Sequence, residues 1–263
     1  GNYGFVQAKA SITGPLSSKL AARLSFSGTQ RDGLLYHINS QQNVNDLNNL
    51  GFRGQLLYVP SDKVKITFIG DYTRQRPNGY AQVFAGVVPT LRAAYRQFDA
   101  IIKDLNYTVP SRNPFDRLID TDTPWRSNQE LGGASVNADI ALGAGTLTST
   151  TAWRFWNWDP SSDRDFTGLQ ALKLSQAPSK HNQYSQEIRW SGALHSKVSA
   201  VFGAFYFAQD LKSDPDQTEE SGTSQWRFSQ STTSPLWKTP GLLDGYGIKT
   251  RQNMNTQSAA LFG

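Results

Sequence analysis

The sequence has no cysteine, a single methionine and only three histidines. Without cysteine the chain forms no disulfide and no Cys-based zinc or redox site. His37, His181 and His195 lie far apart in the sequence and show no metal-ligand spacing. We therefore expect no metal site and no cofactor.

Catalytic motifs and long apolar runs are also missing. No stretch approaches the ~20 apolar residues of a transmembrane helix. The sequence has no glycine-rich phosphate loop, nucleophile elbow or His-Glu metal motif, so we expect a protein that is not an enzyme. The 26 basic and 21 acidic residues give a formal net charge of +5, but no basic cluster indicates a nucleic-acid partner.

Aromatic residues and two-residue periodicity dominate what is present. Aromatics make up 12% of the chain, with seven tryptophans. From Leu20 to Arg31, apolar side chains such as Leu24 and Phe26 alternate with polar ones such as Arg23 and Ser25. Alternation places one kind on each face of a strand. Its length is close to the ~9–11 residues with which a tilted strand crosses a bilayer, whereas soluble strands average nearer ~5–6 residues.

The same pattern recurs along the chain. It predicts strands at 5–13, 20–31, 52–58, 64–73, 131–142, 147–156, 183–191 and 198–208, with a ninth beginning near Asn253. Both faces of 198–208 are apolar, so the pattern does not assign its inner and outer sides. Within the long interval 74–128, apolar spacing predicts a short amphipathic helix over 90–105.

The connections alternate in length. Those at 14–19, 60–63, 143–145 and 191–197 are short, whereas 32–50, 74–128, 157–182 and 209–252 are long. Outer-membrane barrels have short periplasmic turns and long extracellular loops. Aromatics near the predicted strand ends fit an interfacial girdle: Tyr3, Phe5, Tyr58, Tyr72, Trp153, Phe155, Tyr184 and Trp190. The sequence predicts an all-β fold, an antiparallel transmembrane β-barrel.

Three ordered stretches resemble TonB-dependent receptors. They are Gly14 to Gly33, Gly51 to Asp62 with Asp71-Tyr72 after it, and Tyr184 to Arg189 followed by Phe202 to Phe207. The resemblance implies a barrel of about 22 strands with an N-terminal plug. Eight full strands and part of a ninth are visible, so we expect residues 1–263 to be a partial barrel domain from the first half. The plug and the C-terminal strands would lie outside it.

The resemblance also implies a function and a location. Such receptors lie in the outer membrane of Gram-negative bacteria, in contact with its lipid, and are energised by the TonB complex. They take up scarce ligands such as ferric siderophores, other iron chelates, cobalamin or saccharides. The residues from strand ends and loops that we expect nearest the extracellular rim, and therefore at a ligand, are Arg74, Arg76, Tyr80, Arg154, Trp156 and Trp158.

Other interpretations remain open at this point. A small passive barrel would act as a pore or adhesion surface, and a soluble β-rich carbohydrate-binding protein would have shorter strands. Two acidic groups are conceivable loop calcium sites, although their spacing fits no EF-hand. They are Asp159, Asp163 and Asp165, and Asp214, Asp216, Glu219 and Glu220.

Overall fold

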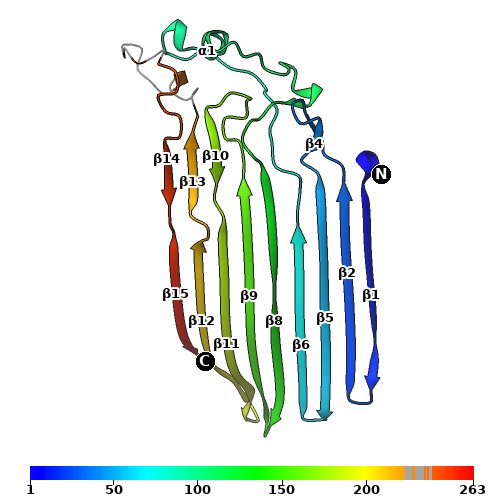
Figure 1. Cartoon of the computed structure of the whole chain (residues 1–263). Helices are drawn as coiled ribbons and strands as arrows, with labels where there is room; N and C mark the ends of the chain where they lie inside the picture. The colour runs from blue at the N-terminus through cyan, green and yellow to red at the C-terminus, as the bar shows by residue number, and fades with distance from the viewer. Residues whose placement is uncertain (223–226, 229–233, 235, 237–238) are drawn as a thin grey trace.

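The computed structural model describes residues 1–222, 227–228, 234, 236 and 239–263. Nine long antiparallel strands lie side by side (Figure 1). They are β1 (Val6–Ser17), β2 (Leu20–Arg31), β5 (Leu47–Ser61), β6 (Val64–Gln75), β8 (Arg126–Leu142), β9 (Gly145–Ser161), β11 (Ser179–His195), β12 (Val198–Ser213) and β15 (Asn253–Phe262). These are the eight predicted strands and the ninth. Among the described strands β1 pairs only with β2 and β15 only with β12, so the sheet is open.

Shorter elements gather at the end of the sheet that carries the long connections, which we call the loop end (Figure 1). There β10 (Leu172–Gln176), β13 (Gln217–Ser221) and β14 (Gly247–Thr250) extend the main sheet. A second sheet has the order β4-β3-β7, formed by Gln42–Val44, Leu35–His37 and Leu118–Ile119. The helical pieces are η1 (Asn2–Gly4), η2 (Ala94–Arg96), α1 (Phe98–Asp104) and η3 (Pro114–Asp116). The opposite end, with the short connections, is the turn end.

The first short turn was predicted too early. We expected Gly14 and Pro15 to end the strand, but β1 continues to Ser17 and the turn consists of residues 18 and 19. Proline removes a backbone donor, which an edge strand tolerates on its unpaired side. Because β1 has one partner strand among those described, Pro15 remains within it, next to a register shift.

Most strands are also longer than the alternation predicted. β8 and β9 each span 17 residues, and both reach well past the predicted limits at the loop end. There polar residues such as Asn128 and Asp159 occupy the face that is apolar below. The alternation of apolar and polar residues stops there because both faces of the strand are polar. The strand itself continues.

The predicted helix over 90–105 is largely wrong. Only Phe98–Asp104 is α-helical, preceded by the short η2. Gln97, between them, has an extended backbone (φ −76, ψ 150). Its side chain accepts a hydrogen bond from the Thr90 backbone N–H and donates to the Thr90 carbonyl. These bonds hold the segment before α1 as a loop. No helix among the described residues has the length and apolar character needed to span a membrane.

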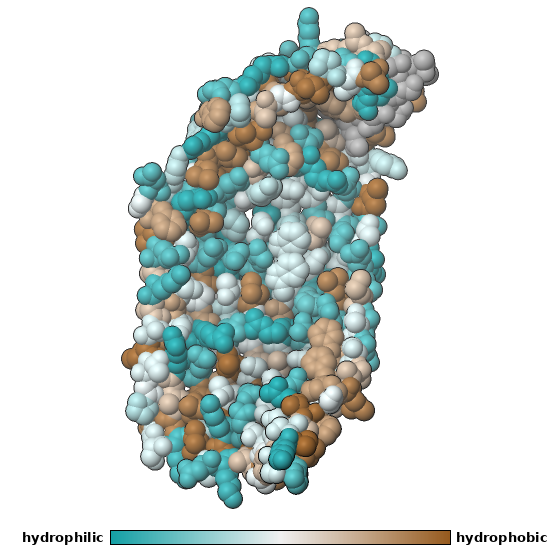
Figure 2. All heavy atoms as spheres, turned by 180° about the vertical axis from the view of Figure 1, so that it is seen from behind, coloured by the Kyte–Doolittle hydropathy of each residue, from teal (hydrophilic) through white to brown (hydrophobic). Residues whose placement is uncertain are grey.

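Strand register separates the sheet into two faces, because directly paired residues point to the same side. The apolar face contains Leu24, Phe52, Phe68, Val136 and Ile188. The polar face contains their sequence neighbours, for example Ser25 and Arg53, which pair with each other. Figure 2 shows one side of the sheet on which hydrophilic and near-neutral residues prevail over the middle.

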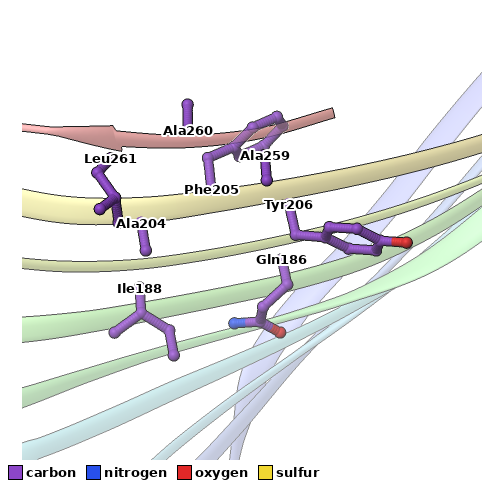
Figure 3. Close-up of a pocket in the computed structure, with 8 residues that line it drawn as sticks. All are labelled: Gln186, Ile188, Ala204, Phe205, Tyr206, Ala259, Ala260 and Leu261. Atoms are coloured by element: carbon purple, nitrogen blue, oxygen red, sulfur yellow. The ribbon is translucent and has the colours of Figure 1, made fainter. Parts of the chain in front are cut away.

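The register also assigns the strand that the sequence left open. Phe202 and Tyr206 of β12 pair with Trp190 and Gln186, on the apolar face. The intervening Phe205 therefore belongs to the polar face. A groove of about 370 Å³ runs along these strands. Figure 3 draws the residues that line it: Gln186, Ile188, Ala204, Phe205, Tyr206, Ala259, Ala260 and Leu261.

The apolar face carries a wide band without charge. Leu24 is 63% exposed, Phe52 50% and Ile188 48%. Burying such side chains in an apolar medium is strongly favourable. The charged residues that the register places on this face all lie at the loop end: Arg74, Arg126, Glu130, Asp159, Lys180, Asp210 and Lys212. A wide, solvent-exposed band that is mostly apolar, carries no charge and meets charged residues at the loop end is the surface that lipid requires.

Candidate functional site

Two stacked tryptophans project from the polar face near the loop end of β9. The Trp156 and Trp158 ring centroids are 5.6 Å apart, with an interplanar angle of 15°. The indole N–H of Trp156 donates to Gln129 Oε1 at 3.2 Å, and that of Trp158 donates to Ser127 Oγ at 3.4 Å. These bonds to β8 fix the orientation of both rings. Such a platform is suited to stacking on a planar or sugar ring.

An arginine lies on the same face, two residues closer to the turn end. Arg154 Nη1 is 2.6 Å from Asp71 Oδ1. Asp71 also pairs in register with Arg53 of β5, so a basic residue lies on each side of this carboxylate. The Asp71 side chain is 19% exposed and that of Arg154 is 40% exposed, which leaves part of the guanidinium accessible. Guanidinium groups bind carboxylates and other anionic oxygens by paired hydrogen bonds.

Basic residues predominate over the whole polar face of the long strands. The register places seven basic side chains on it, Lys9, Arg23, Arg31, Arg53, Lys65, Arg154 and Arg189. The acidic ones are Asp71, Asp139 and Glu187. A low-dielectric wall lined with charge of one sign raises the local concentration of ions of the opposite sign. This face therefore attracts anions.

The six predicted rim residues do not form one site. Arg154, Trp156 and Trp158 share the polar face. Arg74 lies on the apolar side of β6. Arg76 follows the end of β6, and its Nη2 is 3.1 Å from Oε1 of Glu130, a residue of the apolar side. Tyr80 is exposed in the loop after β6 and lines a pocket with Trp158.

The sequence interpretation also missed members of the polar-face group. Asp71 forms an ion pair with Arg154 across β8, and Arg53 pairs in register with Asp71. Gln129 accepts the indole N–H of Trp156 from the neighbouring strand. Their alternation placed them on the polar face, but only the strand register shows which residues lie next to one another across the sheet. The two-residue spacing from Tyr72 could already have placed Arg74 on the apolar side.

The loop end contains a cluster of carboxylates at the junction of two loops, formed by Asp120, Asp122, Asp163 and Asp165. Asp163 is 2% exposed and accepts hydrogen bonds from the backbone N–H groups of Asp122, Asp165 and Phe166 at 3.0–3.2 Å. Burial, and then the charge of Asp165, raises the pKa of Asp163 to about 7. The Asp163 carboxylate thus joins its own loop to the loop of Asp122 through backbone N–H groups.

The acidic residues considered as calcium sites do not come together in either group. Asp163 and Asp165 belong to the loop cluster, whereas several of the others form ion pairs. Asp159 lies on β9 and pairs with Arg126 at 2.6 Å. Asp214 lies 3.0 Å from Lys180 Nζ, Asp216 is 2.7 Å from Arg251 Nε, and Glu219 pairs with Arg164. Within the described part of the chain, no group of three or more His, Asp or Glu side chains is arranged to hold a metal ion.

No protein-family model and no curated protein matches this chain. Solved structures do match its fold, at about a tenth sequence identity. The ferric yersiniabactin uptake receptor FyuA from Yersinia pestis matches with a TM-score of 0.61 at 11% identity, over 99% of this chain and 42% of that one. The siderophore receptor PiuA from Acinetobacter baumannii matches at 0.60 and 11%, over 99% and 38%. The ferric-catecholate import receptor Fiu from E. coli K12 matches at 0.57 and 9%, over 99% and 49%.

The chain thus spans less than half the length of each of these receptors. The matched structures are transport receptors, not enzymes. They include the ferripyoverdine receptor of the outer membrane of Pseudomonas aeruginosa, with a TM-score of 0.53 at 9% identity, over 99% of this chain and 32% of that one. The predicted outer-membrane barrel is confirmed at the level of the fold. This chain has the fold of a section of a siderophore-receptor barrel, as its resemblance to TonB-dependent receptors implied.

Proposed function

We propose that residues 1–263 are a partial barrel domain of an outer-membrane receptor that takes up an anionic ligand with energy from the TonB complex. In this proposal the apolar face contacts outer-membrane lipid and the polar face lines the lumen. The observation that carries it is the basic excess on the polar face together with its tryptophan platform. The fold match to receptors for iron chelates supports the same function.

The ligand class follows from the side chains on the lumen wall. Arg154 and Arg53 provide positive charge, while Trp156 and Trp158 provide a flat aromatic surface a few residues above. A ferric siderophore combines anionic oxygens with planar groups and is therefore the ligand we propose. A neutral saccharide would use the tryptophans but not the positive charge.

The test uses the polypeptide as its gene encodes it, expressed in its host after deletion of the native copy. Binding and uptake of an iron-55-labelled ferric catecholate are measured for Trp156→Ala/Trp158→Ala. Each aromatic contact is worth ~0.5–1.5 kcal/mol beyond area burial, so we expect roughly tenfold weaker binding. Trp153→Leu, on the apolar face, is the matched control and should bind normally.

Two results would contradict the proposal. Unchanged binding and uptake in the double tryptophan variant would show that the ligand does not contact this part of the polar face. Uptake that continues in a strain without the TonB complex would instead support a passive barrel.

A further inference from the structure

The hydrogen bonds that orient the tryptophan platform continue into a chain with a fixed direction. Trp156 donates its indole N–H to Gln129 Oε1 at 3.2 Å, and Gln129 Nε2 donates to Gln75 Oε1 at 3.0 Å. An indole nitrogen can only donate. Gln129 must therefore present its oxygen to Trp156 and its nitrogen to Gln75, which in turn must present its own oxygen. The direction of both amides follows from the chemistry of the indole.

This direction leaves hydrogen-bond donors free on the polar face. Among the described residues, the amide nitrogen of Gln75 donates no hydrogen bond and that of Gln129 donates one of its two. Ser127 Oγ accepts from Trp158 at 3.4 Å and keeps its own hydrogen for another acceptor. The side-chain oxygens of Gln75, Gln129 and Ser127 thus each receive a hydrogen bond already. Each of the three residues still has a donor to offer.

The free donors lie at one level, beside the tryptophans. Gln75, Gln129 and Trp158 pair in register across β6, β8 and β9, so Gln75 lies two strand spacings, roughly 10 Å, from Trp158. All three side chains are half-buried and remain partly accessible. The row continues to Asn49 on β5 and to Ser179 on β11. From β5 to β11 this row therefore carries hydrogen-bonding groups without charge.

A pocket of about 400 Å³ opens at the loop end of this row. Tyr80, Ser127 and Trp158 line it, together with further serines. Arg126 is the one charged residue of this lining, and its Nε is 2.6 Å from Asp159 Oδ2. The pocket therefore offers hydroxyl groups and an aromatic wall, while its positive charge is already paired.

We propose that Gln75, Gln129 and Ser127 form a carbonyl-binding subsite, which favours ligands that carry an amide or ester carbonyl next to a planar ring. The ring would stack on Trp156 and Trp158, and the carbonyl oxygen would accept from the free donors beside them. A carbonyl oxygen only accepts, whereas a sugar hydroxyl must also donate and would find these side-chain oxygens already bonded. The inference rests on the proposed function and names the residues that determine which anionic ligands are preferred.

The experiment compares two gallium tris-catecholates of equal charge. One links its catechol rings through amides, and the other links them through ethylene groups that have no carbonyl. The full gene product is purified in detergent, and the Kd of each probe is measured by isothermal titration calorimetry. A neutral hydrogen bond changes affinity by roughly twofold to tenfold. We therefore expect the unmodified protein to bind the amide probe at least about threefold more tightly than the ethylene probe.

Gln75→Met removes two donors from a residue that does not contact Trp156. It should weaken binding of the amide probe about threefold and leave the affinity for the ethylene probe unchanged. Gln55→Met is the matched control, because it makes the same change on the polar face of β5 nearer the turn end. It should leave both affinities unchanged.

Three results would overturn the subsite while the uptake proposal stands. They are equal binding of the two probes to the unmodified protein, equal weakening of both probes by Gln75→Met, and the same loss in the control variant. Failure of both probes to bind would overturn the proposed function and this inference with it. The comparison of the two probes in the unmodified protein keeps the test decisive if Gln75→Met fails to assemble.

Discussion

Arg154 on β9 reaches Asp71 on β6 across the whole width of β8, with 2.6 Å between Nη1 and Oδ1. The residue between them in the register is Gly133. A Cβ at Gly133 would lie 2.1 Å from the Trp153 carbonyl oxygen and 2.9 Å from Cδ of Arg154. The absence of a side chain at one position therefore permits an ion pair between non-adjacent strands.

Gly133→Ala should destabilise the barrel and displace Arg154. Because the contact with a backbone oxygen is far below van der Waals distance, the strand must shift, which typically costs ~1–3 kcal/mol. The measurement is the temperature at which the barrel unfolds, detected as the change from its folded to its unfolded mobility on detergent gels. Gly70→Ala is the control, since its Cβ would find its nearest atom 3.9 Å away. Equal effects of the two substitutions would contradict this account of Gly133.

Leu24→Arg should prevent outer-membrane assembly, whereas Ser25→Arg should be tolerated. Leu24 lies on the charge-free face, while Ser25 lies beside Arg53 on the polar face. A basic side chain facing lipid at mid-membrane costs roughly 2–4 kcal/mol. Assembly is measured as the folded fraction in isolated outer membranes. If both variants reached the membrane equally, the assignment of faces would be wrong.

The loop junction around Asp163 should open more readily as pH rises. The pKa of Asp163 is raised to about 7 in the folded loops, against an ordinary value of 3.8. The stabilisation is therefore complete below pH 3.8 and is lost as pH rises through 7, since the unfolded loop gives up its proton first. We expect the free energy of local opening to fall by roughly 1–3 kcal/mol between pH 5 and pH 8.

Hydrogen exchange of residues 163–172, corrected for intrinsic rates, measures this change. Asp122→Asn should reduce it, because the Asp122 N–H bond to Asp163 remains while one neighbouring carboxylate is removed. Opening that is independent of pH, in the unmodified protein, would contradict the raised pKa of Asp163.

The strands were largely predictable because the lipid boundary forces alternation. Leu24 and Ser25 lie on the faces that the sequence indicated. The strand ends were not predictable, because β8 and β9 extend beyond the apolar band, where alternation has no physical cause. The faces of Phe202 and Phe205 required the pairing of β12 with β11 and β15.

The candidate site was only partly predictable for the same reason. Trp156 and Trp158 were identified from their type and position, and they do share one face. Arg74 was grouped with them by proximity to a strand end, although its alternation with Tyr72 places it on the apolar side. The junction of Asp122 with Asp163 joins loops 41 residues apart, and no local pattern encodes such a meeting.

The central claim is that one face of this sheet contacts lipid and the other contacts water. Because residues 1–263 contain no cysteine, single cysteines can be introduced from Ala21 to Ser27 of β2 and labelled with nitroxide in the membrane-embedded gene product. We predict that collision with oxygen peaks at Ala22, Leu24 and Phe26, and collision with a water-soluble nickel chelate peaks at Arg23, Ser25 and Ser27. Absence of this two-residue alternation, or equal access of the nickel chelate to both sets, would contradict the account.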